Sequence, residues 1–171
     1  IFKKADEALE FPISKLILEG PADQLNITEN TQPSIFLVSY SIFSLVKTEF
    51  NIDLNKAKYF AGHSLGEYSA LAAANSVDFN DAIKLLKKRG KSMQLAVPFG
   101  NGAMIAILGQ EIKNIEKILL DIDVKNCQIA NDNCPGQIVV SGTISEINKL
   151  IDTLKKLSIK NIKLPVSAPF H

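Results

Sequence analysis

The chain has few of the side chains that bind metals or form disulfides, since its 171 residues include only two cysteines and two histidines. Cys127 and Cys134 do not form a C-x-x-C pair and have no histidine nearby, so we expect reduced thiols in a cytoplasmic protein and no metal site. The formal net charge of +1 does not indicate a nucleic acid partner. No apolar run is long enough to span a bilayer, so we expect no membrane association.

The composition is that of a folded protein, with 46% hydrophobic and 22% charged residues. The length is sufficient for one domain, or for one domain with a small insert. We expect a monomer that is truncated at both ends, because the sequence starts at Ile1 rather than at a methionine and stops at His171.

The most informative stretch is G-x-S-x-G at residues 62–66, between a predicted strand at 57–61 and a predicted helix at 65–75. A serine on a sharp strand-to-helix turn projects its hydroxyl outward, and flanking glycines are needed where neighbouring backbones pass too close for a Cβ. The same turn directs the backbone N–H of Leu65 and the positive end of the following helix toward the site of reaction, which predicts half of an oxyanion hole.

Two further helices are predicted around this turn. The first covers residues 31–50, with Thr31 as cap and Pro33 in the first turn, and we expect it to be buried because apolar residues surround it. The second covers residues 79–96 and places Arg89 in the middle of its apolar face, with Lys84, Lys87 and Lys91 on the far side. A guanidinium that points inward needs an anionic or carbonyl partner, either a structural carboxylate or a substrate.

The second half predicts strands at 103–108, 124–131, 136–142 and 161–166, with helices at 111–120 and 145–157. This β-α-β-β-α-β order is that of a ferredoxin-like subdomain. The fold class is therefore α/β, with an α/β hydrolase-like core that contains a serine elbow. We assign residues 1–101 to the core, 102–166 to the small subdomain and 167–171 to a return to the core.

A serine nucleophile needs a base, and histidine is the usual one. His63 precedes Ser64 directly, and because adjacent side chains on a tight turn point apart, it is expected to shape the pocket or touch a substrate carboxylate. That leaves His171 as the partner of Ser64 if the protein is a serine enzyme. Asp132 or a carbonyl oxygen is left as the group that orients the imidazole.

Four segments, residues 62–71, 89–94, 133–137 and 165–171, resemble the malonyl-CoA:acyl carrier protein transacylases and related acyltransferase domains of fatty-acid and polyketide synthases. The resemblance implies that Ser64 carries the acyl group, His171 is its base and the N–H of Leu65 stabilises the oxyanion. It implies that Arg89 binds the malonyl carboxylate with two hydrogen bonds, and that His63 and Phe170 contact the substrate.

By the same resemblance the substrate is a coenzyme A thioester, the partner is acyl carrier protein and no cofactor is needed. The family has a first strand before the position of Ile1 and core elements after that of His171, which implies an internal portion of a longer protein. A bulky Phe170 and Leu65 resemble the members that select malonyl over methylmalonyl groups.

Three alternatives remain at this level. A serine hydrolase or thioesterase would use the same Ser64 and His171 but would not need Arg89 inside. A non-catalytic subunit would retain only the fold, and an acyltransferase domain of a large synthase would share the chemistry. For an acidic carrier protein, Lys155, Lys156, Lys160 and Lys163 form a candidate docking surface, although lysine runs are usually just solvated.

Overall fold

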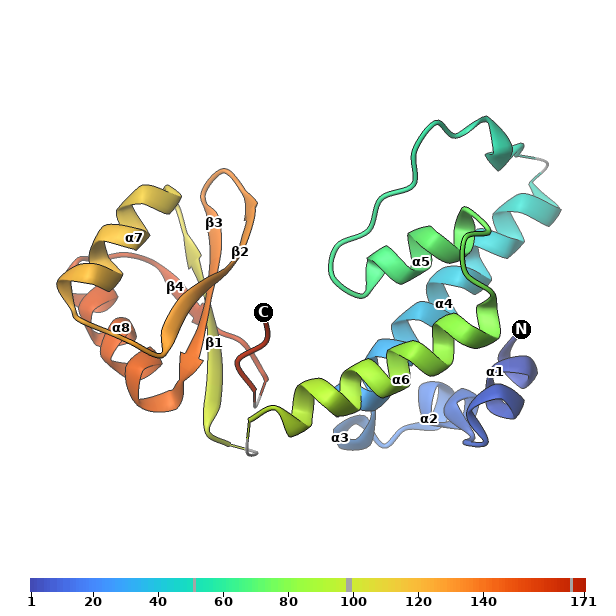
Figure 1. Cartoon of the computed structure of the whole chain (residues 1–171), viewed down its shortest axis with the longest axis horizontal. Helices are drawn as coiled ribbons and strands as arrows, with labels where there is room; N and C mark the ends of the chain where they lie inside the picture. The colour runs from blue at the N-terminus through green and yellow to red at the C-terminus, as the bar shows by residue number, and fades with distance from the viewer. Residues whose placement is uncertain (51, 98–99, 167) are drawn as a thin grey trace. The chain divides into compact units, whose positions relative to one another are not determined.

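The computed structural model describes residues 1–50, 52–97, 100–166 and 168–171, apart from the side chain of residue 55. The chain divides into two compact units, Ile1–Ser92 and Met93–His171. Among the described residues, the first unit contains helices only, and all four strands belong to the second (Figure 1). The predicted division at residues 101 and 166 stays a prediction, and residue 167 lies outside the described residues.

The first unit is built around α4 (Thr28–Glu49). The other helices are α1 (Phe2–Leu9), α2 (Ile13–Glu19), α3 (Ala22–Leu25), α5 (Gly66–Ala73) and α6 (Phe79–Leu95), with a short 3-10 turn at Leu54–Lys56. Phe36 and Leu37 of α4 are fully buried against Ile83 and Leu86 of α6. The α6 helix therefore packs its apolar stripe on α4, as its 3.6-residue periodicity requires.

The start of α4 differs from the prediction. The helix begins at Thr28, and Thr31 is not its cap. The Thr31 hydroxyl instead turns back and donates a hydrogen bond to the carbonyl oxygen of Leu25 at 2.7 Å, which a short β-hydroxyl side chain inside a first turn can do. Pro33 thus lies inside the helix, one turn later than predicted.

The expectation that α4 is buried holds for only one of its sides. One side of α4 carries buried residues such as Phe36 and Leu37, whereas Ile42 is 57% and Leu45 is 53% exposed. The sequence of α4 is only weakly amphipathic, so its apolar pattern does not reveal which side packs against α5 and α6. The contacts with the other helices determine which side of α4 is buried.

The predicted strand at residues 57–61 is wrong as well. These residues form an irregular segment in the structure, and Tyr59 is 88% exposed. A strand needs a hydrogen-bonded neighbour, and every strand in the described part of the chain belongs to the second unit. The apolar run Tyr59-Phe60-Ala61 therefore has β propensity but no strand beside it.

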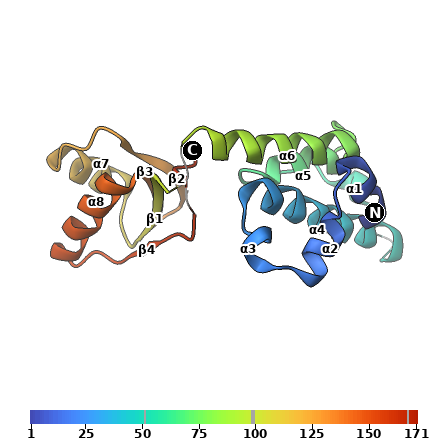
Figure 2. The same ribbon diagram turned by 90° about the horizontal axis from the view of Figure 1, so that it is seen from below.

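The second unit follows the predicted order of elements: β1 (Gly102–Leu108), α7 (Ile112–Asp121), β2 (Cys127–Cys134), β3 (Gln137–Thr143), α8 (Ile144–Lys156) and β4 (Asn161–Lys163). The sheet order is β2-β3-β1-β4 and each neighbouring pair is antiparallel. Both helices cover one face of this sheet (Figures 1 and 2). Ile105, Val140, Ile115 and Leu150 are fully buried between the two layers.

Several strand boundaries differ from the predicted ones because pairing, not composition, sets them. The β2 strand starts and ends three residues later than expected, and at its end Cys134 still pairs with Gln137 across a tight hairpin. Gly136 has a φ of +82°, which a hairpin turn requires and glycine adopts without strain. The β4 strand ends at Lys163, three residues earlier than predicted, at the last residue paired with β1.

Candidate active site

Ser64 lies on a tight turn immediately before α5. Its φ is +53°, in the left-handed region that few non-glycine residues adopt. The Gly66 N–H donates to the His63 carbonyl at 2.9 Å, and the Glu67 N–H donates to the Ser64 carbonyl at 3.2 Å. A positive φ at a non-glycine residue is strained, and such strain is often found at functional sites.

The two glycines of the motif differ in how much room their surroundings leave for a side chain. A Cβ at Gly62 would lie 1.9 Å from the carbonyl oxygen of Gly66, so the turn closes only with glycine at that position. A Cβ at Gly66 would meet nothing within 4 Å among the described residues. The expected close approach is therefore found at Gly62 and not at Gly66.

Leu65 forms the N-cap of α5, with helical φ and ψ of −63° and −24°. A helix leaves its first N–H groups without intrahelical acceptors, and these groups together carry the positive end of the helix dipole. The N–H of Leu65, next to the Ser64 hydroxyl in the chain, belongs to this end. Its position is that expected of an oxyanion donor, and its use as one stays a prediction.

Arg89 reaches the serine from α6. Its Nη2 donates a hydrogen bond to Ser64 Oγ at 3.2 Å, and its Nη1 donates to Gln32 Oε1 on α4. The guanidinium also lies over the ring of Tyr68, with Cζ 5.9 Å from the ring centroid, a distance at which cation–π attraction contributes. Three separate elements thus fix one cation beside the hydroxyl.

The helical wheel that predicted an inward Arg89 is only partly correct. The buried stripe of α6 consists of Phe79, Ala82, Ile83, Leu86 and Gly90, and Arg89 lies half-buried at the edge of that stripe. Leu85, one helical turn before Arg89, is 47% exposed. The centre of the stripe is set by the packing of α6 on α4, which the sequence of α6 alone does not specify.

Lys87 was predicted on the far side with Lys84 and Lys91, and this is wrong. Lys87 is half-buried on the other edge of the stripe, where Nζ donates to Asn30 Oδ1 at 2.6 Å and lies 4.5 Å from the centroid of the Phe11 ring. Burial lowers the pKa of Lys87, with Glu29 opposing and Lys91 reinforcing the change. Lys84 and Lys91 are exposed as expected.

Of the remaining predicted site residues, His63 belongs to the first unit and the others to the second. His63 is exposed on the turn itself. His171, Phe170 and Asp132 belong to the second unit, which is described separately, so the pairing of Ser64 with His171 stays a prediction. Sequence reasoning missed Gln32 and Tyr68, although a buried glutamine within an apolar helix is a recognisable signal.

A pocket of about 460 Å³ lies beside the turn. Its walls include Gly62, His63 and Leu65 from the turn, and Tyr40 and Phe43 from α4. Among the described residues, this lining includes His63 and Leu65 of the predicted site but neither Ser64 nor Arg89.

The structure adds two observations on what the protein could bind. Within the described ranges, no group of three or more histidine, cysteine, aspartate or glutamate side chains is arranged to hold a metal ion. Over the same residues, no helix has the length and apolar character to cross a membrane.

The acyl transferase domain family matches residues 2–171. The chain belongs to this family. It is 42% identical over 174 residues to the malonyl CoA-acyl carrier protein transacylase of Bacillus subtilis, and this alignment covers 100% of the chain but 54% of the relative. The same enzyme from Haemophilus influenzae is 41% identical, with 99% and 54% covered. The acyltransferase-family chain thus spans about half the length of the curated relatives it matches.

Solved structures give the same result. The acyl-carrier-protein S-malonyltransferase of Bartonella henselae superposes with a TM-score of 0.92 at 41% identity, covering 99% of this chain and 55% of that one. A malonyl-transacylase solved in complex with a type II polyketide acyl carrier protein superposes with a TM-score of 0.87 at 35% identity, covering 98% and 54%. These matches establish the α/β fold class of this acyltransferase-family chain.

Proposed function

We propose that the protein transfers a malonyl group from malonyl-CoA to the phosphopantetheine thiol of acyl carrier protein, in fatty acid biosynthesis. The observation that carries the proposal is the hydrogen bond between Arg89 Nη2 and Ser64 Oγ at 3.2 Å. An acyl group attached to Ser64 that ends in a carboxylate would place its negative charge within reach of this guanidinium. Arginine suits that task because its planar donors match the two oxygens of a carboxylate.

The reaction proceeds in two acyl transfers. Ser64 Oγ attacks the thioester carbonyl carbon, the carbon–sulfur bond breaks, and the serine proton passes through His171 to the departing coenzyme A sulfur. The N–H of Leu65 stabilises the negative oxygen of the tetrahedral intermediate. The carrier thiol then attacks malonyl-Ser64, its proton passes to His171, and that proton returns to Ser64 Oγ as the ester bond breaks.

Selectivity follows from the charge of Arg89. An acetyl group would leave the guanidinium unpaired in the pocket, so a dicarboxylic acyl group is preferred. His63 and Phe170 complete the substrate pocket, and the bulk of Phe170 and Leu65 disfavours an α-methyl group. Water would discharge malonyl-Ser64 in a hydrolase or thioesterase, which is the alternative reaction for the same serine.

The proposed enzyme also has a defined domain architecture, cellular location and oligomeric state. Residues 62–66 act as a serine elbow of an α/β hydrolase-like core, and residues 102–166 act as a ferredoxin-like subdomain. The enzyme is a cytoplasmic monomer without a resident cofactor, in keeping with its two unpaired cysteines. The names of the relatives, malonyl CoA-acyl carrier protein transacylases, support the choice of both substrates.

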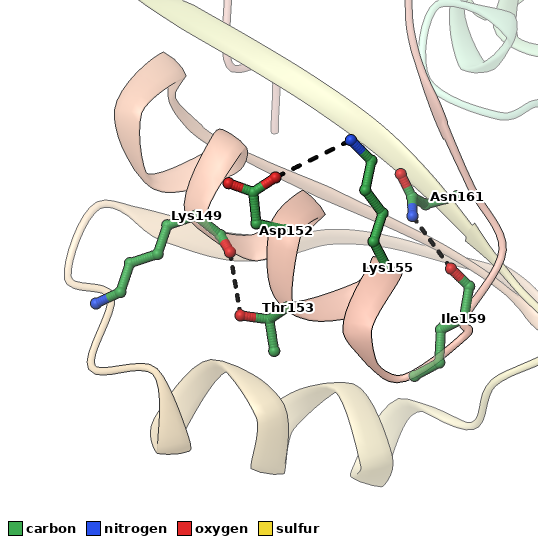
Figure 3. A network of polar contacts seen from close by, with 6 residues as sticks. All are labelled: Lys149, Asp152, Thr153, Lys155, Ile159 and Asn161. Carbon is green, nitrogen blue, oxygen red and sulfur yellow. Dashed lines mark hydrogen bonds and ion pairs between the residues drawn. The ribbon is translucent and has the colours of Figure 1, made fainter.

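The lysines of the second unit are the proposed contact for an acidic carrier protein. Lys155 lies in the last turn of α8, and its Nζ is 4.0 Å from Asp152 Oδ1 (Figure 3). Both side chains of this pair are 71% exposed, and such surface pairs contribute little to stability. Lys155 can therefore exchange Asp152 for a carboxylate of the carrier at small cost.

The test is intact-mass measurement of the protein, as its gene encodes it, after mixing with malonyl-CoA. A malonyl adduct that requires Ser64, weakens in Arg89→Ala and is removed by acyl carrier protein supports the transfer. Ser64→Ala is the control for the site of attachment. Release of free malonate without an accumulating adduct would show a hydrolase instead, and the absence of both adduct and turnover would contradict either enzyme.

A further inference from the structure

Gln32 is the partner of Arg89 on α4 and is only 4% exposed. A buried amide must satisfy both its donor and its acceptor. Its Nε2 donates to Thr28 Oγ1 at 3.2 Å, one helical turn earlier, and its Oε1 accepts from Arg89 Nη1. The Thr28 contact therefore orients the amide so that its oxygen, not its NH₂ group, faces the guanidinium.

The contact with Gln32 restricts Arg89 in a specific way. A guanidinium is planar and rigid, so fixing one terminal nitrogen and the plane of the group fixes the other nitrogen. With Nη1 on Gln32 and the plane over Tyr68, Nη2 is directed to Ser64 Oγ at 3.2 Å. We infer that Gln32 is a positioning residue, which aims Arg89 at the serine and so determines the preference of the site for acyl groups with a carboxylate.

Gln32 is uncharged, and this matters for the charge of Arg89. An amide oxygen accepts a hydrogen bond without cancelling the positive charge of Arg89, whereas a carboxylate at the same position would form an ion pair with it. Over the residues that the structure describes, no aspartate or glutamate forms an ion pair with Arg89. The charge is thus held in place by a neutral group and stays available to an anionic acyl group.

The same two helices provide a matched comparison. Asn30 on α4 accepts a hydrogen bond from Lys87 on α6 at 2.6 Å, and its Nδ2 donates to the Gln24 carbonyl at 2.9 Å. This is also a buried amide that holds a cation across the α4–α6 contact, with Asn30 only 5% exposed. Lys87, however, lies over the Phe11 ring rather than at Ser64. Asn30 therefore reports on helix packing alone.

The experiment compares Gln32→Glu and Gln32→Met with the control Asn30→Asp in the protein as its gene encodes it. The readout is the ratio of kcat/KM for malonyl-CoA over acetyl-CoA, with thermal unfolding measured for each variant. We expect both Gln32 variants to lower this ratio about tenfold or more, Gln32→Met by losing one hydrogen bond to a charged group and Gln32→Glu by pairing the charge of Arg89. We expect Asn30→Asp to leave the ratio within about twofold.

A second comparison separates positioning from a general structural defect. If Gln32 acts through Arg89, Gln32→Glu should leave the ratio unchanged in an Arg89→Ala background, because the group it positions is gone. A further loss in that background would overturn the inference. The inference would also be overturned if Arg89→Ala lowered the malonyl-to-acetyl ratio while both Gln32 variants folded and kept the wild-type ratio.

The part of the inference that concerns selectivity rests on the proposed function, and the two can fail separately. If the wild type shows no malonyl preference, or Arg89→Ala leaves the preference intact, the proposed function fails. A crystal structure of Gln32→Met then still tests the positioning role. Separation of Arg89 Nη2 from Ser64 Oγ supports that role, and a retained contact overturns it.

Discussion

Gly90 of α6 packs directly on the backbone of Glu29 in α4: a Cβ at Gly90 would lie 2.6 Å from the Glu29 Cα and 2.6 Å from the Thr28 carbonyl oxygen. This contact brings α6 close enough for its side chains to reach the buried amides of α4. Arg89, the residue before Gly90, and Gln32 meet across this contact. The distance between the two helices therefore determines the geometry beside Ser64.

Gly90→Ala is predicted to destabilise the protein by about 1–3 kcal/mol, because the clash involves backbone atoms that cannot rotate away. The higher helix propensity of alanine returns only about 1 kcal/mol. Chemical denaturation of the variant and wild type measures the difference. Equal or higher stability in Gly90→Ala would show that α4 and α6 can separate without loss.

The two glycines of the serine motif should respond differently to the same change. Gly62→Ala forces a Cβ to within 1.9 Å of the Gly66 carbonyl oxygen, so we expect the turn to open and serine reactivity to be lost. Gly66→Ala adds a methyl group where nothing described lies within 4 Å. We expect its unfolding free energy to stay within about 1 kcal/mol of wild type, or to rise through helix propensity.

Thermal unfolding of both variants, with labelling of Ser64 by a fluorophosphonate as a measure of reactivity, checks this contrast. A fluorophosphonate needs an activated serine, so it reports on the turn even without the natural substrates. Loss of stability in Gly66→Ala equal to that in Gly62→Ala would contradict the asymmetry of the turn.

Cys127 should make stability fall at alkaline pH. Burial, reinforced by Glu146, raises the pKa of the Cys127 thiol from 9.0 to about 11. The unfolded thiol thus ionises first as pH rises, so the stabilisation is complete below pH 9 and is lost as pH approaches 11. The loss attributable to this thiol is about 1–3 kcal/mol.

Unfolding free energies of wild type and Cys127→Val at several pH values between 8 and about 10.5 test this, since the variant should lose less stability over that range. Cys134→Ser is the matched control, because Cys134 is exposed whereas Cys127 is buried. The same difference predicts that iodoacetamide alkylates Cys134 well before Cys127 in the folded protein. Parallel pH profiles of wild type and Cys127→Val would refute the assignment.

Charge reversal should reveal whether the lysines of the second unit bind the carrier. Changing Lys155, Lys156, Lys160 and Lys163 to glutamate is expected to raise the KM for acyl carrier protein about tenfold or more while leaving malonyl loading from coenzyme A unchanged. Reversal of Lys113 and Lys117, on α7, gives a control with charge changes elsewhere on the same unit. Unchanged use of the carrier would exclude this docking surface.

The sequence predicted elements whose signals are local. Strand–helix alternation gave the order of β1, α7, β2, β3, α8 and β4, because each element has its own apolar periodicity. Ser64 was identified from its glycines, and the need of Arg89 for a partner was inferred from its place on α6. The predicted strand at 57–61 failed because a strand depends on a neighbour that local composition does not reveal.

What the sequence determined by itself was local: a serine on a glycine-flanked turn, an arginine on α6 that needs a partner, and the family to which the chain belongs. Only the tertiary structure decided which groups meet. Gln32 and Arg89 are 57 residues apart, as are Asn30 and Lys87, and only one of these pairs reaches Ser64. That choice depends on how α6 lies on α4, since Arg89 and Lys87 flank opposite edges of the buried stripe of α6.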